Sequence, residues 1–144
     1  MLLRFAFALN HDFTFGKNHF GDADQYLIYQ WNEEGFNRIE EMNNHFKTMD
    51  EYHDHGSRKK GQAIIETFKE KGVKVLVSKQ FGRNIKMVNN HFVPVIVSAD
   101  TVDEVKSVIY HHVNWLMEEV NNQPERHKLF DLRKGVLKTI IPKD

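Results

Sequence analysis

The chain has 144 residues, of which 40% are hydrophobic, and its 20 basic residues balance 20 acidic ones. This length suits one domain, and a neutral chain has no overall field that would attract nucleic acid. Because there is no cysteine, disulfides, thiolate ligands and thiol nucleophiles are excluded. Any metal must be held by histidine, carboxylate, methionine or backbone groups.

Three strands are predicted in the first third of the chain. Leu2–Leu9 is apolar apart from Arg4, which is typical of a central strand covered on both faces. Gln25–Trp31 and Phe36–Met42 are rich in β-forming residues and are separated by a short turn. The three strands should therefore form an antiparallel meander. Residues 10–21 and 43–56 are predicted as loops, the second of them mobile.

A helix followed by a strand is predicted next. Ala63, Ile64 and Phe68 fall on one helical face, and Gly72 is suited to the position just past a helix end. The run Val73–Val77 then reads as a buried strand. A short helix in which Ile85 and Val88 face the core leads to a further strand, over Val93–Val97.

A long helix is predicted to begin after Thr101, which with Glu104 forms a capping box. Its apolar stripe covers about five turns and includes a histidine, and the stripe residues are Val105, Val108, Ile109, His112, Val113, Leu116 and Val120. Residues 1–122 are thus predicted as one domain and residues 123–144 as a C-terminal extension. From Glu125 onward six basic residues face three acidic ones. The apolar residues of this extension favour either an edge strand or a dimer contact.

Three short motifs lie in order along these elements: His19-Phe20-Gly21, His55-Gly56 and Phe81-Gly82-Arg83-Asn84. Over roughly residues 3 to 120 this arrangement resembles the dinitrogenase iron–molybdenum cofactor biosynthesis family, which includes nitrogenase cofactor carriers. Arg83 and Ile85 stand where that family usually has proline and alanine. The resemblance implies a ribonuclease H-like α/β fold, with three helices on a mixed five-stranded sheet in the order 3-2-1-4-5.

Histidines before the first helix are candidate metal ligands. His53 and His55 are two residues apart, so in an extended segment both imidazoles lie on the same side, as two ligands of one ion do. The alternative is a solvated loop with scattered histidines. A zinc site needs further ligands that the sequence does not identify, so zinc is the weaker prediction.

A pre-assembled anionic cluster needs fewer protein ligands. The resemblance implies that His55 anchors an iron–sulfur or iron–molybdenum cluster, assisted by His53 or His19. Gly56 and Ser57 would provide a turn and a helix cap, where backbone N–H groups and the helix dipole favour anions. Arg58, Lys59 and Lys60 would be the charge partners of the cluster. Alternatively, these cations form a solvated first turn, and the first motif is structural, with Phe20 filling the core and Gly21 allowing a tight turn.

Enzymatic activity is not predicted. A two-metal nuclease of ribonuclease H-like fold needs carboxylates on its central strands, and neither Leu2–Leu9 nor Val73–Val77 has one. No phosphate-binding loop or nucleophile elbow is present. The sequence therefore predicts a small metallocluster-binding or carrier protein, or else a non-catalytic interaction or regulatory module without metal.

The expected partners are a metallocluster, a protein that delivers or accepts it, and a second copy in a homodimer. The apolar N-terminal run has no basic segment and no cleavage site of a signal peptide, and no stretch has transmembrane length. We therefore expect a cytoplasmic protein that binds neither nucleic acid nor membrane.

Overall fold

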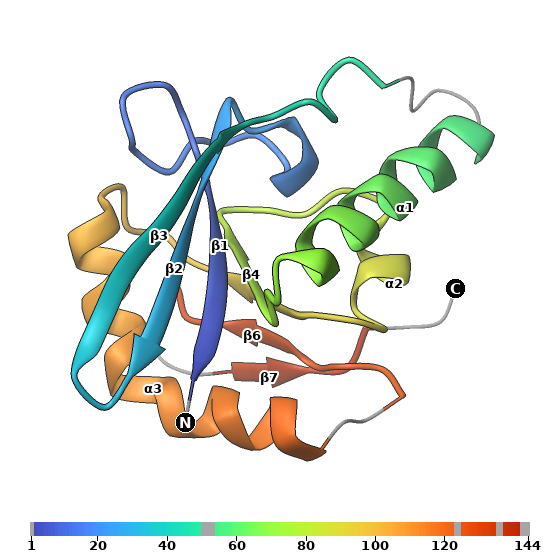
Figure 1. The fold of residues 1–144 in the computed structure, drawn as a ribbon. Coiled ribbons are helices and arrows are strands. Elements are labelled where there is room, and N and C mark those ends of the chain that lie inside the picture. Colours follow the sequence, from blue (N-terminus) through green and yellow to red (C-terminus); the bar gives the residue numbers. More distant parts are fainter. Residues whose placement is uncertain (1, 50–53, 123–124, 135–136, 142–144) are drawn as a thin grey trace.

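A computed structural model describes residues 2–49, 54–122, 125–134 and 137–141, with the side chains of residues 54–57 and 137 outside this description. The fold has three layers, with α3 on one face of a mixed sheet and α1 and α2 on the other (Figure 1). The strands are β1 (Leu3–Leu9), β2 (Gln25–Asn32), β3 (Gly35–Asn43), β4 (Val75–Ser78), β5 (Val93–Ile96), β6 (Leu129–Asp131) and β7 (Leu137–Thr139). The helices are α1 (Asp54–Glu70), α2 (Ile85–Val88) and α3 (Val102–Asn122), with a 3₁₀ turn, η1 (Phe20–Asp22).

The sheet has seven strands in the order β3-β2-β1-β4-β5-β6-β7. The predicted mixed α/β class, the three helices and the order of the first five strands are confirmed. The prediction of only five strands is wrong, because the extension adds β6 parallel to β5 and β7 antiparallel to β6. The ribonuclease H-like likeness stays a prediction.

Strand β1 separates two cores because its successive side chains point to opposite faces. Phe5 and Phe7 pack on the α3 side, with Val105, Ile109 and Leu116 among others. Ala6 and Ala8 face α1 and α2, where the larger side chains of Ile64, Phe68 and Val88 fill the space. A strand buried on both faces is what its apolar sequence predicts.

The ends of the helices follow local sequence signals. Thr101 Oγ1 accepts a 3.2 Å hydrogen bond from the Glu104 amide, which confirms the predicted helix cap before α3. The Glu104 side chain reaches back to Thr101 as predicted, but it accepts a 2.8 Å bond from the hydroxyl. Gly72 after α1 has φ +73°, a left-handed conformation that glycine adopts without strain. No helix in the described ranges is long and apolar enough to cross a membrane.

A buried pair of side chains fixes the start of the extension. His127 Nδ1 lies 3.3 Å from Glu119 Oε2 of α3, and the Lys128 amide donates a 3.1 Å hydrogen bond to the same oxygen. Asn89, after α2, accepts a bond from the His127 amide at 2.8 Å and donates one to its carbonyl at 3.1 Å. The extension is therefore attached to both helical layers before it adds its strands to the sheet.

Candidate functional site

The first and third sequence motifs meet at one end of the sheet, beyond the carboxyl ends of β1 and β4. His19 forms an isolated parallel bridge with Gln80, and the Phe20 amide donates a 3.0 Å hydrogen bond to the Gln80 carbonyl. The amide of the Gln80 side chain also donates to the Lys17 carbonyl. We call this region the carboxyl edge, and it consists of residues 10–24, residues 79–84 and the first turns of α1. In open α/β sheets such an edge is the usual place for ligands.

Three glycines, one from each neighbouring segment, allow these segments to approach closely. A Cβ on Gly21 would lie 3.0 Å from Lys60 Cε of α1, and one on Gly61 would lie 3.1 Å from Met87 Sδ of α2. A Cβ on Gly82 would lie 2.9 Å from His19 Nδ1. The first motif therefore packs on α1, α1 packs on α2, and Gly82 of the third motif contacts His19 of the first. A Cβ at any of the three would therefore require the neighbouring side chain to shift.

The first motif combines a structural residue with an exposed one. Phe20 is buried and its ring stacks on that of Phe81 at 5.7 Å, so the interpretation that Phe20 fills the core is confirmed. Tyr26 Oη donates a 2.7 Å hydrogen bond to the Phe20 carbonyl. Burial, followed by the charge of Asp22, raises the pKa of Tyr26 well above its ordinary value, so it remains a neutral donor. His19 is exposed on this fixed turn and lies against Gly82.

Lys60 is the buried cation of the site. It is only 1% exposed, and its Nζ lies 2.5 Å from Asp22 Oδ1 of η1. The interpretation of Lys60 as part of a solvated first turn is wrong, because this ion pair joins α1 to the first motif. Lys60 lies four and eight residues before Ile64 and Phe68, on the same helical face. That spacing is the signal that could have predicted its burial, whereas no sequence pattern pointed to Asp22.

The remaining predicted residues, apart from His53, belong to the first turns of α1. The helix begins at Asp54, so the predicted loop through Gly56 and the helix cap at Ser57 are wrong, and the backbone of residues 55–57 is helical. Arg58 and Lys59 are exposed. His53 lies outside the described residues, as do the side chains of His55 and Ser57. Their roles as ligands therefore stay predictions.

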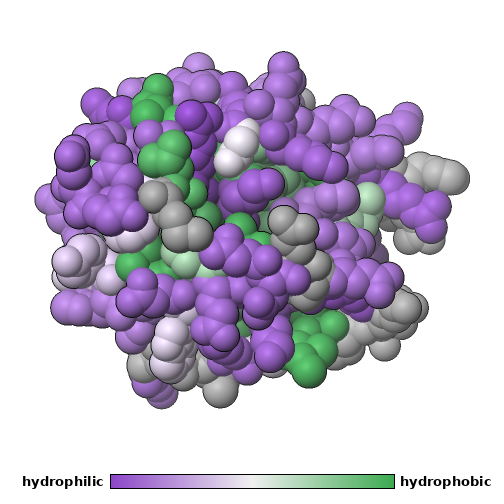
Figure 2. Space-filling view, turned by 60° about the horizontal axis from the view of Figure 1, so that its bottom comes forward, coloured by the Kyte–Doolittle hydropathy of each residue, from purple (hydrophilic) through white to green (hydrophobic). Residues whose placement is uncertain are grey.

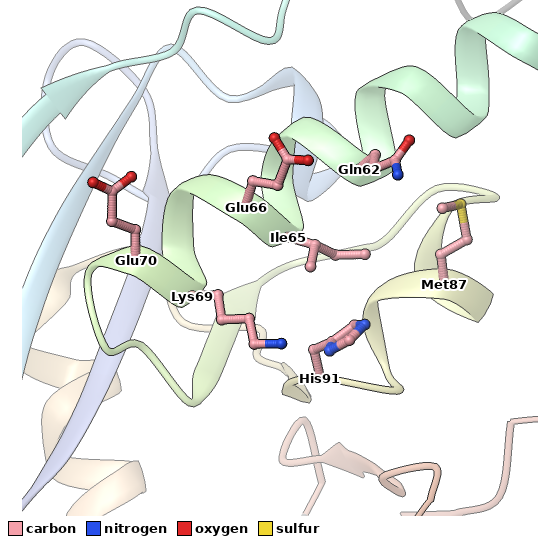
Figure 3. Close-up of a pocket in the computed structure, with 7 residues that line it drawn as sticks. All are labelled: Gln62, Ile65, Glu66, Lys69, Glu70, Met87 and His91. Atoms are coloured by element: carbon pink, nitrogen blue, oxygen red, sulfur yellow. The ribbon is translucent and has the colours of Figure 1, made fainter.

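A groove between α1 and α2 was not predicted. It has a volume of about 540 Å³ and is lined by Gln62, Ile65, Glu66, Lys69, Glu70, Met87 and His91. Figure 3 shows Ile65 and Lys69 extending toward α2 and His91, while Glu66 and Glu70 point away from His91. Burial, and then the positive charges of Lys69 and His127, lower the pKa of His91 below its ordinary value of 6.5. This ring therefore stays neutral to lower pH than an unperturbed histidine.

Within the described ranges, no group of three or more histidine and carboxylate side chains is arranged to hold a metal ion. The exposed His19 and the cations Arg58 and Lys59 can instead supply one ligand and positive charge to a larger anion. This donor set fits a cluster that arrives assembled better than a bare ion, since an ion needs several ligands from the protein.

Comparison with known proteins agrees with the motif arrangement. The sequence pattern of the family described as dinitrogenase iron-molybdenum cofactor matches residues 1–110. A crystal structure from Methanocaldococcus jannaschii, provisionally described as a dinitrogenase, is similar with a TM-score of 0.57 and 15% identity, over 99% of each chain. At this identity the likeness concerns the fold alone. Among proteins with curated functions, none matches.

Proposed function

Because the chain belongs to the dinitrogenase iron–molybdenum cofactor family, we propose that it is a non-catalytic protein that binds or carries an anionic iron–sulfur or iron–molybdenum cluster. In this proposal the cluster is cargo, which the protein receives from one protein and passes to another. The cytoplasm is the proposed setting.

The observation that carries the proposal is the contact at the carboxyl edge between the first and third motifs around the exposed His19. Its ring lies against Gly82, on a turn whose partners are the buried Tyr26 and Lys60. An imidazole held in this way provides a ligand without reorganisation of the core. His55 in the first turn of α1 is the proposed second ligand, since the Lys60–Asp22 ion pair holds that helix beside η1.

Positive charge at the start of α1 supports the anionic character of the ligand. Arg58 and Lys59 are exposed, and the first backbone N–H groups of a helix favour anions. Lys60 contributes less directly, because its ammonium already pairs with Asp22. Salt should therefore weaken binding through Arg58 and Lys59, as exposed charges are screened within about 10 Å at 0.1 M ionic strength.

The second candidate function is an interaction or regulatory module of the same fold without metal. It is favoured by the lack of a multidentate metal group in the described ranges. The two functions differ in whether the purified protein takes up a cluster.

Anaerobic reconstitution with iron and sulfide tests the proposal. The wild-type protein should gain cluster absorbance and bound iron in constant proportion to protein. His55→Ala and His19→Ala should lose most of the bound iron, while His111→Ala, an exposed histidine of α3, serves as the matched control. Uptake that is equal in all four proteins, or absent from the wild type even with isolated iron–molybdenum cofactor, would favour the interaction module.

A further inference from the structure

The two edges of the sheet are protected to different degrees. Edge strands present unpaired backbone groups, which charged residues and β-bulges usually guard. Strand β3, at one edge, has an irregular register opposite Ile28 and Tyr29 and carries Arg38, Glu40 and Glu41. Strand β7 ends the sheet on the other side, where no strand of the described ranges pairs with its outer edge. Its one charged residue is Lys138.

Lys138 does not guard this edge, because its side chain turns back onto α3. The ammonium lies 4.9 Å from the centre of the Trp115 ring and 5.4 Å from that of Phe130. A lysine over an aromatic face in this way is held by a cation–π interaction. Among the residues that the structure describes, no charged side chain is therefore seen to guard the outer backbone edge of β7.

Apolar surface adjoins the open edge. Trp115 is 45% exposed, and Ile140, directly after β7, is 75% exposed. Ile140 is two residues beyond Lys138, so continuation of the strand alternation places both on the α3 face. Figure 2, which brings forward the side of the molecule with α3, shows separate apolar patches among polar residues. We call Trp115, Lys138 and Ile140 the β7 patch.

We propose that the β7 patch is the interface of a homodimer, in which the β7 strands of two copies pair antiparallel about a two-fold axis. A two-fold interface uses the same surface of both copies, and an antiparallel strand pair is compatible with this symmetry. With the axis at Thr139, Ile140 of each copy stands opposite Lys138 of the other. Each isoleucine then covers the aromatic surface beside that lysine, and the sheet continues across both copies.

Charges beside the patch are complementary in this arrangement. Strands β5 and β6 are parallel, so α3, which connects them, runs in the reverse direction, as β7 does. Glu118 is exposed and lies one turn after Trp115, toward the end of β7 where Ile140 stands. Antiparallel pairing brings the β6–β7 turn of the second copy, with its exposed Lys134, to this same end.

A second copy is a better occupant than an unrelated strand, because a second copy provides both Ile140 opposite Lys138 and Lys134 near Glu118. The opposite charges of Glu118 and Lys134 would meet twice, once on each side of the axis. The equal numbers of basic and acidic residues also leave no net repulsion between copies. This inference is independent of the proposed function.

Disulfide cross-linking of the intact chain tests the geometry directly, since the natural chain has no cysteine. Residues opposite each other in an antiparallel pair have Cα atoms about 4.5–5.5 Å apart, within the range that a disulfide spans. Thr139→Cys should form a covalent dimer under mild oxidation. Ile39→Cys on β3 is the matched control, and it should form at least several-fold less dimer. Equal cross-linking of both variants, or none of Thr139→Cys, would overturn the proposal.

Solution mass tests the contacts. The wild type should sediment at twice the chain mass of 17.0 kDa. Ile140→Lys should return to the single mass, because the new lysine would stand opposite Lys138 of the other copy. Ile39→Lys, also at an exposed isoleucine, should remain dimeric. Glu118→Lys should weaken the dimer, and Glu118→Lys with Lys134→Glu should restore it. A monomeric wild type, or a dimer unaffected by Ile140→Lys, would show that this surface is not the interface.

Discussion

The two faces of the sheet differ in the chemistry of their buried groups. On the α3 face the core is formed by aliphatic and aromatic side chains such as Phe5, Val105 and Leu116. On the α1 face a fully buried lysine, Lys60, and the hydroxyl of Tyr26 bind the turn that carries His19. The first face has the features of a structural core, whereas the second also fixes the position of the carboxyl edge.

This difference has an energetic side. Burial of apolar area stabilises a fold by about 25 cal/mol per Å². It does not specify the geometry of a loop. A buried ion pair adds little net stability, since desolvation of its charges offsets their attraction. We therefore infer that Lys60 and Asp22 are arranged to hold η1 against α1, while α3 supplies more of the stability.

The largest expected effect concerns the α3 face. Leu116 is fully buried, and Leu116→Ala should lower the free energy of unfolding by about 2–5 kcal/mol, because a cavity remains. Cluster binding at a temperature where the variant is folded should be unchanged. Denaturant melts and iron uptake measure the two quantities. A specific loss of binding in the folded variant would contradict the division between the faces.

The ion pair on the α1 face should show an asymmetry between its partners. Asp22→Asn leaves the buried ammonium without this carboxylate and should cost about 2–3 kcal/mol, below the range for a fully buried pair because Asp22 is partly exposed. Lys60→Met leaves a carboxylate that water can reach and should cost less, about 1 kcal/mol. Both costs are read from denaturant melts. The reverse order would mean that Lys60 stabilises the fold chiefly by other contacts.

Much of the fold was predictable because it rests on local periodicity. The runs that form β1, β4 and β5 are apolar and the α3 stripe has a helical period, so burial alone identifies them. Strands β6 and β7 have three residues each, and three residues are too few to show the alternation of a strand. They form because Leu132, Phe130 and the His127–Glu119 pair place the extension beside β5.

The candidate site was predictable only in part. The motifs containing His19 and Gly82 were identified from the sequence, but their mutual contact depends on the register between β1 and β4. The start of α1 was misplaced because His55, Gly56 and Ser57 resemble a turn and a cap. Lys60 was predicted as a charge partner of the cluster, or alternatively as part of a solvated first turn, because charge was given more weight than its spacing from Ile64 and Phe68.

A smaller effect is expected where the α1 face meets His19. In Gly82→Ala the new Cβ would lie 2.9 Å from His19 Nδ1, so the exposed ring must move. Stability should change by less than about 1 kcal/mol, while cluster affinity falls. The control is the same change in a His19→Ala background, where it should have no further effect on affinity. An equal loss in both backgrounds would assign the effect to the loop backbone instead.

The smallest expected effect is a titration on the α1 face. The pKa of His91 should lie below 6.5 in the folded protein, and Lys69→Met should raise it by removing a nearby positive charge. Lys59→Met is the control at an exposed lysine of the same helix. Histidine proton shifts in NMR spectra measure each pKa. A pKa of His91 at or above 6.5 would contradict its partial burial beside these cations.

The same group makes a small contribution to the pH dependence of stability. In the unfolded chain His91 takes up its proton near pH 6.5, before the folded protein does. The contribution of His91 to the free energy of unfolding is therefore fully present above pH 6.5. It is lost as the pH falls toward the lower pKa that His91 has in the folded protein. His91→Gln should remove this part of the dependence in melts recorded between about pH 7.5 and 5.

The most direct test of the account is whether histidine nitrogen at the carboxyl edge binds the cluster. Pulsed electron paramagnetic resonance of reconstituted, reduced protein labelled with ¹⁵N-histidine reports ligand nitrogen. We predict a ¹⁵N coupling in the wild type and in His111→Ala that is lost or altered in His55→Ala and in His19→Ala. A cluster without any histidine coupling, or a coupling that persists unchanged in both edge variants, would contradict the assignment of the site.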